Sequence, residues 1–260
     1  MGFGEVFGKS WKEYKVNFRS IFIFMSIFIL IPGLLVILFN IFSIGNNANL
    51  QKILFNPSLV NMGKSEAYFF IFSLLMSLVA MFLLLLTEAG LINVSLGKNK
   101  YSFKELRDGG LNSLGKFIIF SLVLMIFLGG LFLLLIIPGI IFVIYWIFAV
   151  YVFFGEKKGI LYSLRRSMEI VKGRWWRVFG YSILMILIMV GINIAASLIT
   201  LPTTIIYLIN ITMGKEISSG LFILNSILEV IASFVGNLIS IPLFVLFFKN
   251  LYLDMKKSKN

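Results

Sequence analysis

The sequence predicts an all-α polytopic membrane protein with six transmembrane helices and three cytoplasmic amphipathic helices at the membrane interface. The first observation is compositional. Hydrophobic residues occupy 60% of the 260 positions and charged residues only 13%, and the mean hydropathy is +1.01. A soluble domain is only about half apolar and about a quarter charged, because its surface faces water. Lipid must therefore cover much of this chain.

The second observation is a series of six apolar runs, most of them as long as the roughly 20 residues that a helix needs to cross a bilayer. The fourth run is short, and only Pro138-Gly139 separates it from the third. We interpret this dipeptide as the tight outer turn of a helical hairpin. The predicted spans are Phe18–Ile44, Tyr68–Leu96, Phe117–Ile137, Ile140–Phe154, Val178–Leu201 and Phe222–Phe248.

The third observation is the placement of the basic residues. If six spans alternate in direction, twenty of the 23 Lys and Arg residues lie on the side that holds both termini, and only Lys52, Lys64 and Lys215 lie opposite. Membrane proteins keep such an excess on the cytoplasmic side. We therefore predict a plasma-membrane protein with both termini in the cytoplasm. Its net charge of +12 then indicates binding to anionic lipid headgroups rather than to nucleic acid.

Three cytoplasmic segments have the pattern of amphipathic helices that lie in the interface plane. Before the fifth span, Leu164, Met168 and Val171 recur at helical spacing, with charged residues on the opposite face. The N-terminus and residues 103–117 repeat this pattern. A docking surface for a cytoplasmic protein is the alternative interpretation of the same residues. The predicted anchors at the headgroups are Trp11, Arg165, Arg166, Lys172, Arg174, Trp175, Trp176 and Arg177.

Each amphipathic segment leads into two apolar spans, which suggests a threefold internal organisation. We predict one integral membrane domain over residues 1–260, built from hairpin units at about 1–97, 98–156 and 157–260. The sequence identities between these units are few, so the shared layout is the stronger argument.

Residues 133–180 carry a more specific pattern. It comprises Pro138-Gly139, a short span that ends at Glu156, and the string R-S-x-E-x-x-K-G-R-x-W-R from Arg166 to Arg177. Together with the opening FGKSWKEYKVNF, it resembles the membrane domain found N-terminal to some glycerophosphoryl diester phosphodiesterases. Stand-alone six-helix membrane proteins of bacteria and archaea share that domain. The resemblance implies a membrane module, although Val150 stands where the family often has proline.

The absence of two residue types restricts the chemistry. The sequence contains no Cys and no His, which removes the thiolate nucleophile, the commonest metal ligand and the usual proton carrier near neutral pH. Phosphodiesterase chemistry uses histidine acid/base groups and a carboxylate-held metal, so we do not expect it here. We predict that the protein is not an enzyme and holds no cofactor or metal.

Two acidic residues, Glu88 and Glu229, fall well inside apolar spans, and an ionisable group there is a functional candidate by default. Glu229 lies about 10 Å from the outer end of its span and is followed by Asn237 on or near the same helical face. Ala232 and Gly236 form part of a ladder of small residues beside it. Such a face brings helices close together, so close packing is one interpretation. The lining of a substrate or proton path is the other.

These observations lead to two hypotheses about function. The first is a non-enzymatic integral membrane module that acts as a scaffold or as a lipid-associated accessory protein. The second is a small transporter or exporter component that uses Glu229. An intramembrane enzyme is disfavoured, because no nucleophile with a neighbouring base is evident.

Overall fold

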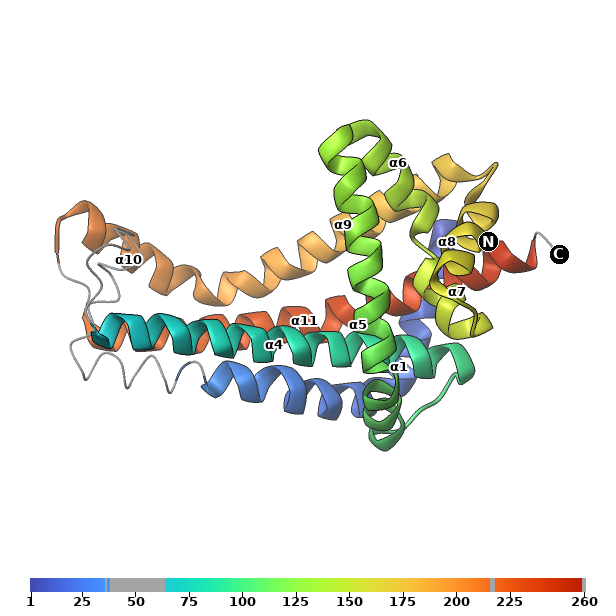
Figure 1. The fold of residues 1–260 in the computed structure, drawn as a ribbon. Helices are drawn as coiled ribbons and strands as arrows, with labels where there is room; N and C mark the ends of the chain where they lie inside the picture. The colour runs from blue at the N-terminus through green and yellow to red at the C-terminus, as the bar shows by residue number, and fades with distance from the viewer. Residues whose placement is uncertain (36, 38–63, 216–217, 259–260) are drawn as a thin grey trace. The chain divides into compact units, whose positions relative to one another are not determined.

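The computed structural model describes residues 1–35, 37, 64–215 and 218–258, and within these it consists of helices and short connections (Figure 1). The end of the first predicted span, residues 38–44, and Lys52 lie outside the described residues. The helices are α1 (Phe3–Met25), a π-helical stretch (Ser26–Leu30), α4 (Lys64–Gly97), α5 (Phe103–Leu134), α6 (Ile136–Trp146), α7 (Ala149–Glu156), α8 (Ile160–Val171), α9 (Trp175–Ser197), a 3₁₀ turn η3 (Leu198–Thr200), α10 (Leu201–Thr212) and α11 (Ser219–Lys257).

Six helical segments of the described chain are long and apolar enough to cross a membrane. This confirms the prediction of an all-helical, multi-pass membrane protein with six spans, judged by length and composition. Five of the six segments begin before the predicted span, and only the second begins after it. The segments are Phe3–Leu35, Leu74–Gly97, Phe103–Leu133, Ile136–Glu156, Trp175–Thr212 and Ser219–Lys257.

The three predicted amphipathic segments are all helical, but only α8 is a separate helix. The N-terminal segment forms the first turns of α1, and residues 103–117 form the first half of α5. In neither place does a proline separate the amphipathic turns from the apolar ones. The backbone hydrogen-bond ladder therefore continues from one into the other.

The turn between the third and fourth spans lies three residues before the predicted one. Leu135 adopts an extended conformation (φ −157°, ψ 133°), and α6 begins directly after it. The prediction of a turn at Pro138-Gly139 is therefore wrong. Proline is tolerated in the first turn of a helix, where its missing N–H has no partner to lose. Gly139 then packs against Phe132 of α5, so closely that a Cβ atom would lie 2.5 Å from the ring.

The chain forms two compact units, each assembled from segments that are distant in sequence. Unit 1 comprises Met1–Phe24, Leu85–Ile192 and Leu238–Asn260, and unit 2 comprises Met25–Leu84 and Asn193–Asn237. The predicted unit 98–156 lies wholly within unit 1, whereas residues 1–97 and 157–260 contribute to both units. The division into three hairpins remains a prediction.

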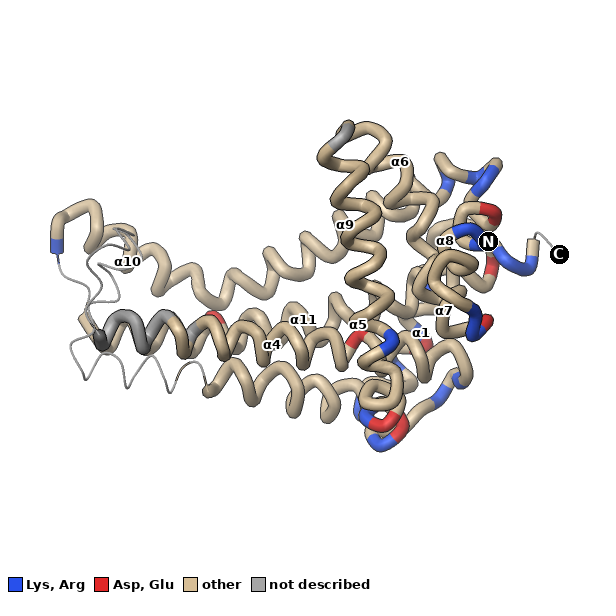
Figure 2. Tube along the Cα trace, viewed as in Figure 1, with Lys and Arg blue, Asp and Glu red and all other residues tan. Residues whose placement is uncertain are grey.

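Unit 1 is organised around the last turns of α11. Leu246, Phe247 and Leu251 are completely buried there, and Tyr14 of α1 donates a hydrogen bond to the carbonyl oxygen of Leu238 at 3.2 Å. Unit 1 also contains every described Lys and Arg except Lys64 and Lys215. Figure 2 shows these charges around the N-terminus, α8, the end of α11 and the turn between α4 and α5.

Within unit 1, α4 and α5 approach each other closely through glycines. A Cβ atom on Gly90 would lie 2.6 Å from the carbonyl oxygen of Leu106, and one on Gly110 would lie 2.9 Å from that of Leu86. Both distances are too short for any side chain. This crossing therefore requires glycine on both helices.

Unit 2 contains the end of α9, the η3 turn, α10 and the first half of α11. Gly33 packs against Val230, with an ideal Cβ only 2.8 Å from Val230 Cγ1. Gly236 faces Asn193 of α9, where a Cβ would lie 2.7 Å from Asn193 Oδ1. The small-residue ladder of α11 thus meets α9 at close range, as such ladders do in membrane proteins.

Candidate functional site

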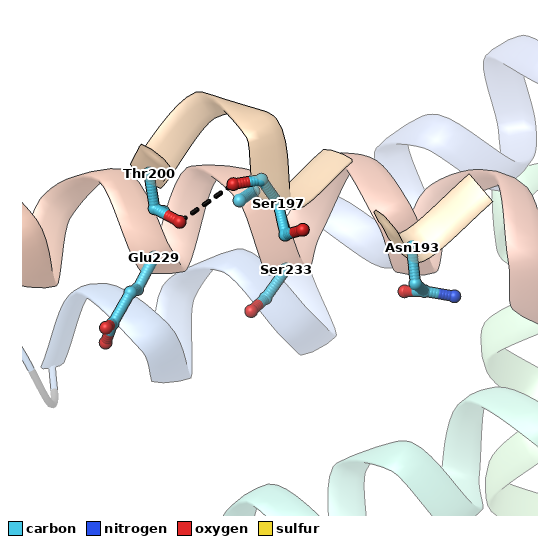
Figure 3. Close-up of a pocket in the computed structure, with 6 residues that line it drawn as sticks. Asn193, Ser197, Thr200, Glu229 and Ser233 are labelled. Carbon is cyan, nitrogen blue, oxygen red and sulfur yellow. Dashed lines mark hydrogen bonds between the residues drawn. The ribbon is translucent and has the colours of Figure 1, made fainter. Parts of the chain in front are cut away.

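An open cavity of about 230 Å³ lies within unit 2, between α11 and the segment formed by α9 and η3, and Asn193, Ser197, Glu229 and Ser233 at its wall are exposed. Glu229 and Ser233 are one turn apart on α11, and polar residues of the facing segment complete the wall (Figure 3). The cavity is too large for one water molecule, which occupies about 30 Å³ in the liquid, and is small for a drug-sized ligand. Its lining residues are Asn193, Ser197, Thr200, Glu229, Ala232 and Ser233.

Two hydrogen bonds hold Glu229 in place. Asn225, one turn earlier on α11, donates from Nδ2 to Glu229 Oε1 at 2.7 Å. Thr203 Oγ1 of α10 in turn donates to Asn225 Oδ1 at 2.7 Å. Because a carboxylate oxygen accepts hydrogen bonds, the amide nitrogen of Asn225 faces Glu229. The carboxylate is therefore oriented by neighbours outside the cavity wall.

The hydroxyl groups on the facing segment are hydrogen-bond acceptors toward the cavity. Ser197 Oγ donates its proton to the carbonyl oxygen of Ile194 at 2.8 Å, and Thr200 Oγ1 donates to that of Ser197 at 2.8 Å (Figure 3). A hydroxyl has one proton and two lone pairs. Once the proton is used within the helix, only lone pairs remain for a ligand.

The helix tightens to a 3₁₀ turn beside the cavity. At η3 the amide of Leu201 donates to the carbonyl oxygen of Leu198, three residues back instead of four. Pro202 has no N–H, so Leu198 receives no α-helical donor from it. Irregular backbone at membrane depth is tolerated where it lines a cavity.

The other two predicted polar residues are not part of this cavity. Asn237 lies on α11 beyond Gly236 and is not among the described lining residues. Glu88 is half-buried in α4 and belongs to unit 1. Of the predicted intramembrane set, the structure thus places Glu229 alone at the cavity.

The predicted anchoring helix, α8, buries its apolar side against its own chain. Leu164, Ile170 and Val171 are buried, and Leu164 belongs to a cluster with Phe120 and Ala149. The exposed side of α8 therefore carries the charges. Leu164, Ile170 and Val171 cover protein, whereas Leu161 of the same helix is 70% exposed, and the position of α8 at the membrane interface remains a prediction.

Ser167, within the R-S-x-E string, has a role that sequence reasoning missed. The fourth span is interrupted between α6 and α7, and the amide of Phe148 at this break donates to Ser167 Oγ at 3.2 Å. Ser167 Oγ donates in turn to the carbonyl oxygen of Tyr145 at 2.7 Å. One side chain of α8 thus satisfies both backbone groups that the break leaves open.

The predicted anchors fall into two groups. Arg165, Lys172 and Trp176 are exposed, Trp176 by 78%, and Trp11 is exposed by 37%. The remainder make contacts within unit 1. Two of them form ion pairs: Arg166 lies 3.2 Å from Glu169, and Arg177 lies 3.7 Å from Asp254. The other two donate to backbone carbonyl oxygens: Arg174 to that of Met255 at 3.3 Å, and Trp175 Nε1 to that of Ile141 at 3.3 Å.

Glu156, which ends α7, accepts from several donors. In the predicted topology it lies on the cytoplasmic side. Lys256 lies 2.9 Å from it, and Tyr162 donates to it at 3.0 Å. This hydrogen bond raises the pKa of the Tyr162 phenol above its ordinary value, because ionised Tyr162 would repel the carboxylate. The acidic residue that ends the short span therefore binds α8 and α11 together.

A second buried polar cluster was not predicted at all. Glu13 of α1 and Lys249 of α11 form a buried ion pair with 2.5 Å between Nζ and each carboxylate oxygen. Asn250 donates to Ser10 Oγ at 3.0 Å beside it. The signal was present, since Ser10, Glu13 and Asn17 lie at helical spacing on one face of α1. It was hidden because the aromatic residues Phe7, Trp11 and Phe18 also recur at helical spacing. They indicated a different face of α1 as its apolar face.

Tyr101 lies in the connection between α4 and α5 and interacts electrostatically with Glu13 of this cluster. Burial raises the pKa of its phenol, and the negative charge of Glu13 raises it further. The Tyr101 hydroxyl is buried without a hydrogen-bond partner among the described residues. Residues near both ends of the chain and in its second connection thus share one buried environment.

The described residues include no group of three or more Asp or Glu side chains that could hold a metal ion. Comparison with known proteins adds no assignment: no protein-family model, no curated protein and no solved structure matches the chain.

Proposed function

We propose that the protein is a non-enzymatic module of the plasma membrane, a scaffold or lipid-associated accessory protein with both termini in the cytoplasm. Its basic surface on unit 1 contacts anionic lipid headgroups, and α8 together with the first turns of α1 and α5 lies at the headgroup level. A cytoplasmic protein partner with an acidic surface is the alternative occupant of the same surface.

The observation that carries this proposal is the separation of charges in unit 1. Among its acidic residues, Glu13, Glu156 and Asp254 are buried or half-buried and paired with cations of the same chain, whereas Glu5 and Glu169 are exposed. Lys158, Arg165 and other basic residues are exposed. The outward surface is therefore more basic than the composition suggests. Each Lys or Arg near an anionic membrane surface contributes about 1 kcal/mol to binding.

The test compares two triple variants of the protein in nanodiscs that contain spin-labelled phosphatidylglycerol or phosphatidylcholine. We expect Lys158→Gln, Arg165→Gln and Lys172→Gln together to lower the preference for phosphatidylglycerol about fivefold or more. The matched control, with Lys52, Lys64 and Lys215 changed to Gln, removes the same charge from the predicted outer side. It should keep the preference. Equal losses in both variants would show that net charge, and not this surface, selects the lipid.

The cavity at Glu229 favours a second function, as a transporter or exporter component. A carrier that couples transport to Glu229 should lose solute flux in proteoliposomes with either Glu229→Gln or Glu229→Leu. If the residue serves packing alone, Glu229→Gln should be nearly silent in assembly and stability. Saturable flux or turnover by the purified protein would contradict the non-enzymatic scaffold and support the second function.

A further inference from the structure

The geometry points to the Glu229 cavity as a binding site for a small monovalent cation, either an alkali-metal ion or a primary ammonium ion. This inference concerns binding. It stands or falls independently of whether the protein is a scaffold or a carrier.

The first argument is the chemical character of the wall. Ser197 and Thr200 have committed their protons to carbonyl oxygens of their own helix, so each offers lone pairs to the cavity. Glu229 adds a carboxylate, and Asn193 and Ser233 add further oxygen atoms. No Lys or Arg is among the described lining residues. Apart from the amide nitrogen of Asn193 and the hydroxyl of Ser233, the wall presents acceptors, which favour a ligand that is a cation or a donor of several hydrogen bonds.

The second argument is charge. One ionised carboxylate balances one positive charge, and an unbalanced charge in a low-dielectric region is costly. A divalent ion would leave a net charge in the site, and Ca²⁺ and Mg²⁺ prefer larger numbers of oxygen ligands, several of them carboxylates or waters. The cavity therefore matches a monovalent ion.

The third argument is the 3₁₀ turn. The η3 turn and Pro202 lie within the fifth span beside the hydroxyls, and the carbonyl oxygen of Ser197 accepts from Thr200 Oγ1. The carbonyl oxygens of Ser197 and Leu198 thus have donors within the helix, so side-chain oxygens are the ligands that this wall offers. No aromatic ring is among the described lining residues, so the wall does not resemble the aromatic cage that quaternary ammonium groups prefer.

The fourth argument is preorganisation. Asn225 holds Glu229, and Thr203 holds Asn225, so the carboxylate is positioned before a ligand arrives. Less ordering is then required on binding, which raises affinity. The chain of hydrogen bonds from Thr203 through Asn225 ends at the carboxylate.

The experiment measures equilibrium binding of radiolabelled sodium and of radiolabelled methylammonium to the full-length protein in detergent. We expect saturable binding of at least one probe, and tetramethylammonium, which has no N–H donors, should compete weakly. Glu229→Gln should weaken binding about thirtyfold or more, and Ser233→Ala about threefold. The matched control is Glu88→Gln, which removes the other intramembrane carboxylate and should bind as the wild type does.

Which probe binds distinguishes an alkali ion from an ammonium ion. If Glu229→Gln does not assemble, Ser233→Leu is the second variant, because its larger side chain fills the cavity and leaves the carboxylate intact. It should abolish binding while the protein remains monodisperse. Binding of neither probe, binding that survives in Glu229→Gln, or an equal loss in Glu88→Gln overturns the inference.

Discussion

The ammonium group of Lys249 lies 2.5 Å from both carboxylate oxygens of Glu13, although 236 positions separate the two residues. Their side chains are only 2% and 7% exposed, so water contributes little to stabilising either charge. Asn250 adds a neighbouring polar contact to Ser10. The first and last helices of the chain are therefore joined by a buried ion pair inside unit 1.

Removal of one partner of this pair should destabilise the protein strongly. We expect Lys249→Met to lower the free energy of unfolding by about 3–5 kcal/mol, because Glu13 would remain buried without a counter-charge. The double variant Glu13→Leu, Lys249→Met should recover most of that loss, since apolar replacements of both partners are often tolerated. Unfolding in mixed detergent micelles measures the difference. A single variant as stable as the wild type would contradict this assignment.

Alanine substitutions at two glycines of α5, Gly110 and Gly115, should change the stability of the protein in opposite directions. Gly110→Ala places a methyl group 2.9 Å from the carbonyl oxygen of Leu86, and we expect it to destabilise the protein by about 1–3 kcal/mol. Gly115→Ala is the matched control in the same helix, where a Cβ meets nothing within 4 Å. It should raise helix stability by up to about 1 kcal/mol. Thermal unfolding followed by size-exclusion chromatography compares the two, and equal effects would argue against the close crossing.

The two adjacent tryptophans should separate into a structural and a lipid-facing residue. Trp175 donates to the carbonyl oxygen of Ile141 and stacks on Phe179 with 4.9 Å between ring centres, so Trp175→Phe should cost about 1 kcal/mol. Trp176 is 78% exposed, and Trp176→Phe should change stability by less than about 0.5 kcal/mol. Lipids brominated near the headgroup should quench less fluorescence after loss of Trp176 than after loss of Trp175. The reverse order would remove Trp176 from the predicted interface.

The proposed orientation can be tested with introduced cysteines, because the natural sequence contains none. We expect Lys9→Cys, Lys172→Cys and Lys257→Cys to react with an impermeant maleimide only from the cytoplasmic side of sealed vesicles. Lys215→Cys should react only from the opposite side, since basic residues are retained in the cytoplasm. Labelling of positions 9 and 257 from different sides would contradict an even number of spans.

The sequence predicted the helical class and the number of spans well, for a clear physical reason. Apolar length and charge asymmetry are properties of local composition, and the bilayer imposes a fixed length on them. The element boundaries were harder. The turn at Leu135 has no Gly or Pro at its centre, so Pro138-Gly139 gave a misleading signal.

The buried faces were predicted less well because periodicity does not say what covers an apolar residue. On α1 the aromatic residues suggested one face, yet Val6, Ser10 and Glu13 are buried while Phe18 is 44% exposed. In a membrane protein an exposed aromatic residue costs little, since lipid surrounds it. Polar residues are therefore the better guide to the interior, as Glu13 shows.

Only some of the residues at the candidate cavity were predicted from the sequence. Glu229 stood out as an acid inside an apolar run, and Ser233 follows it at helical spacing. The contributions of Thr200 and of the 3₁₀ turn before Pro202 depend on which helix faces α11. A single sequence carries no information on that pairing, so these residues could not be assigned to the site.

The position of Lys249 near the end of the chain has a consequence for biosynthesis. The ribosome makes Glu13 of α1 long before its counter-ion Lys249, and four spans lie between the segments that hold the two residues. Through most of translation the nascent chain therefore holds an uncompensated acidic group on its first helix, and unit 1 closes only when the final segment arrives. We expect insertion machinery or lipid to shield α1 until the segment that carries Lys249 has been made.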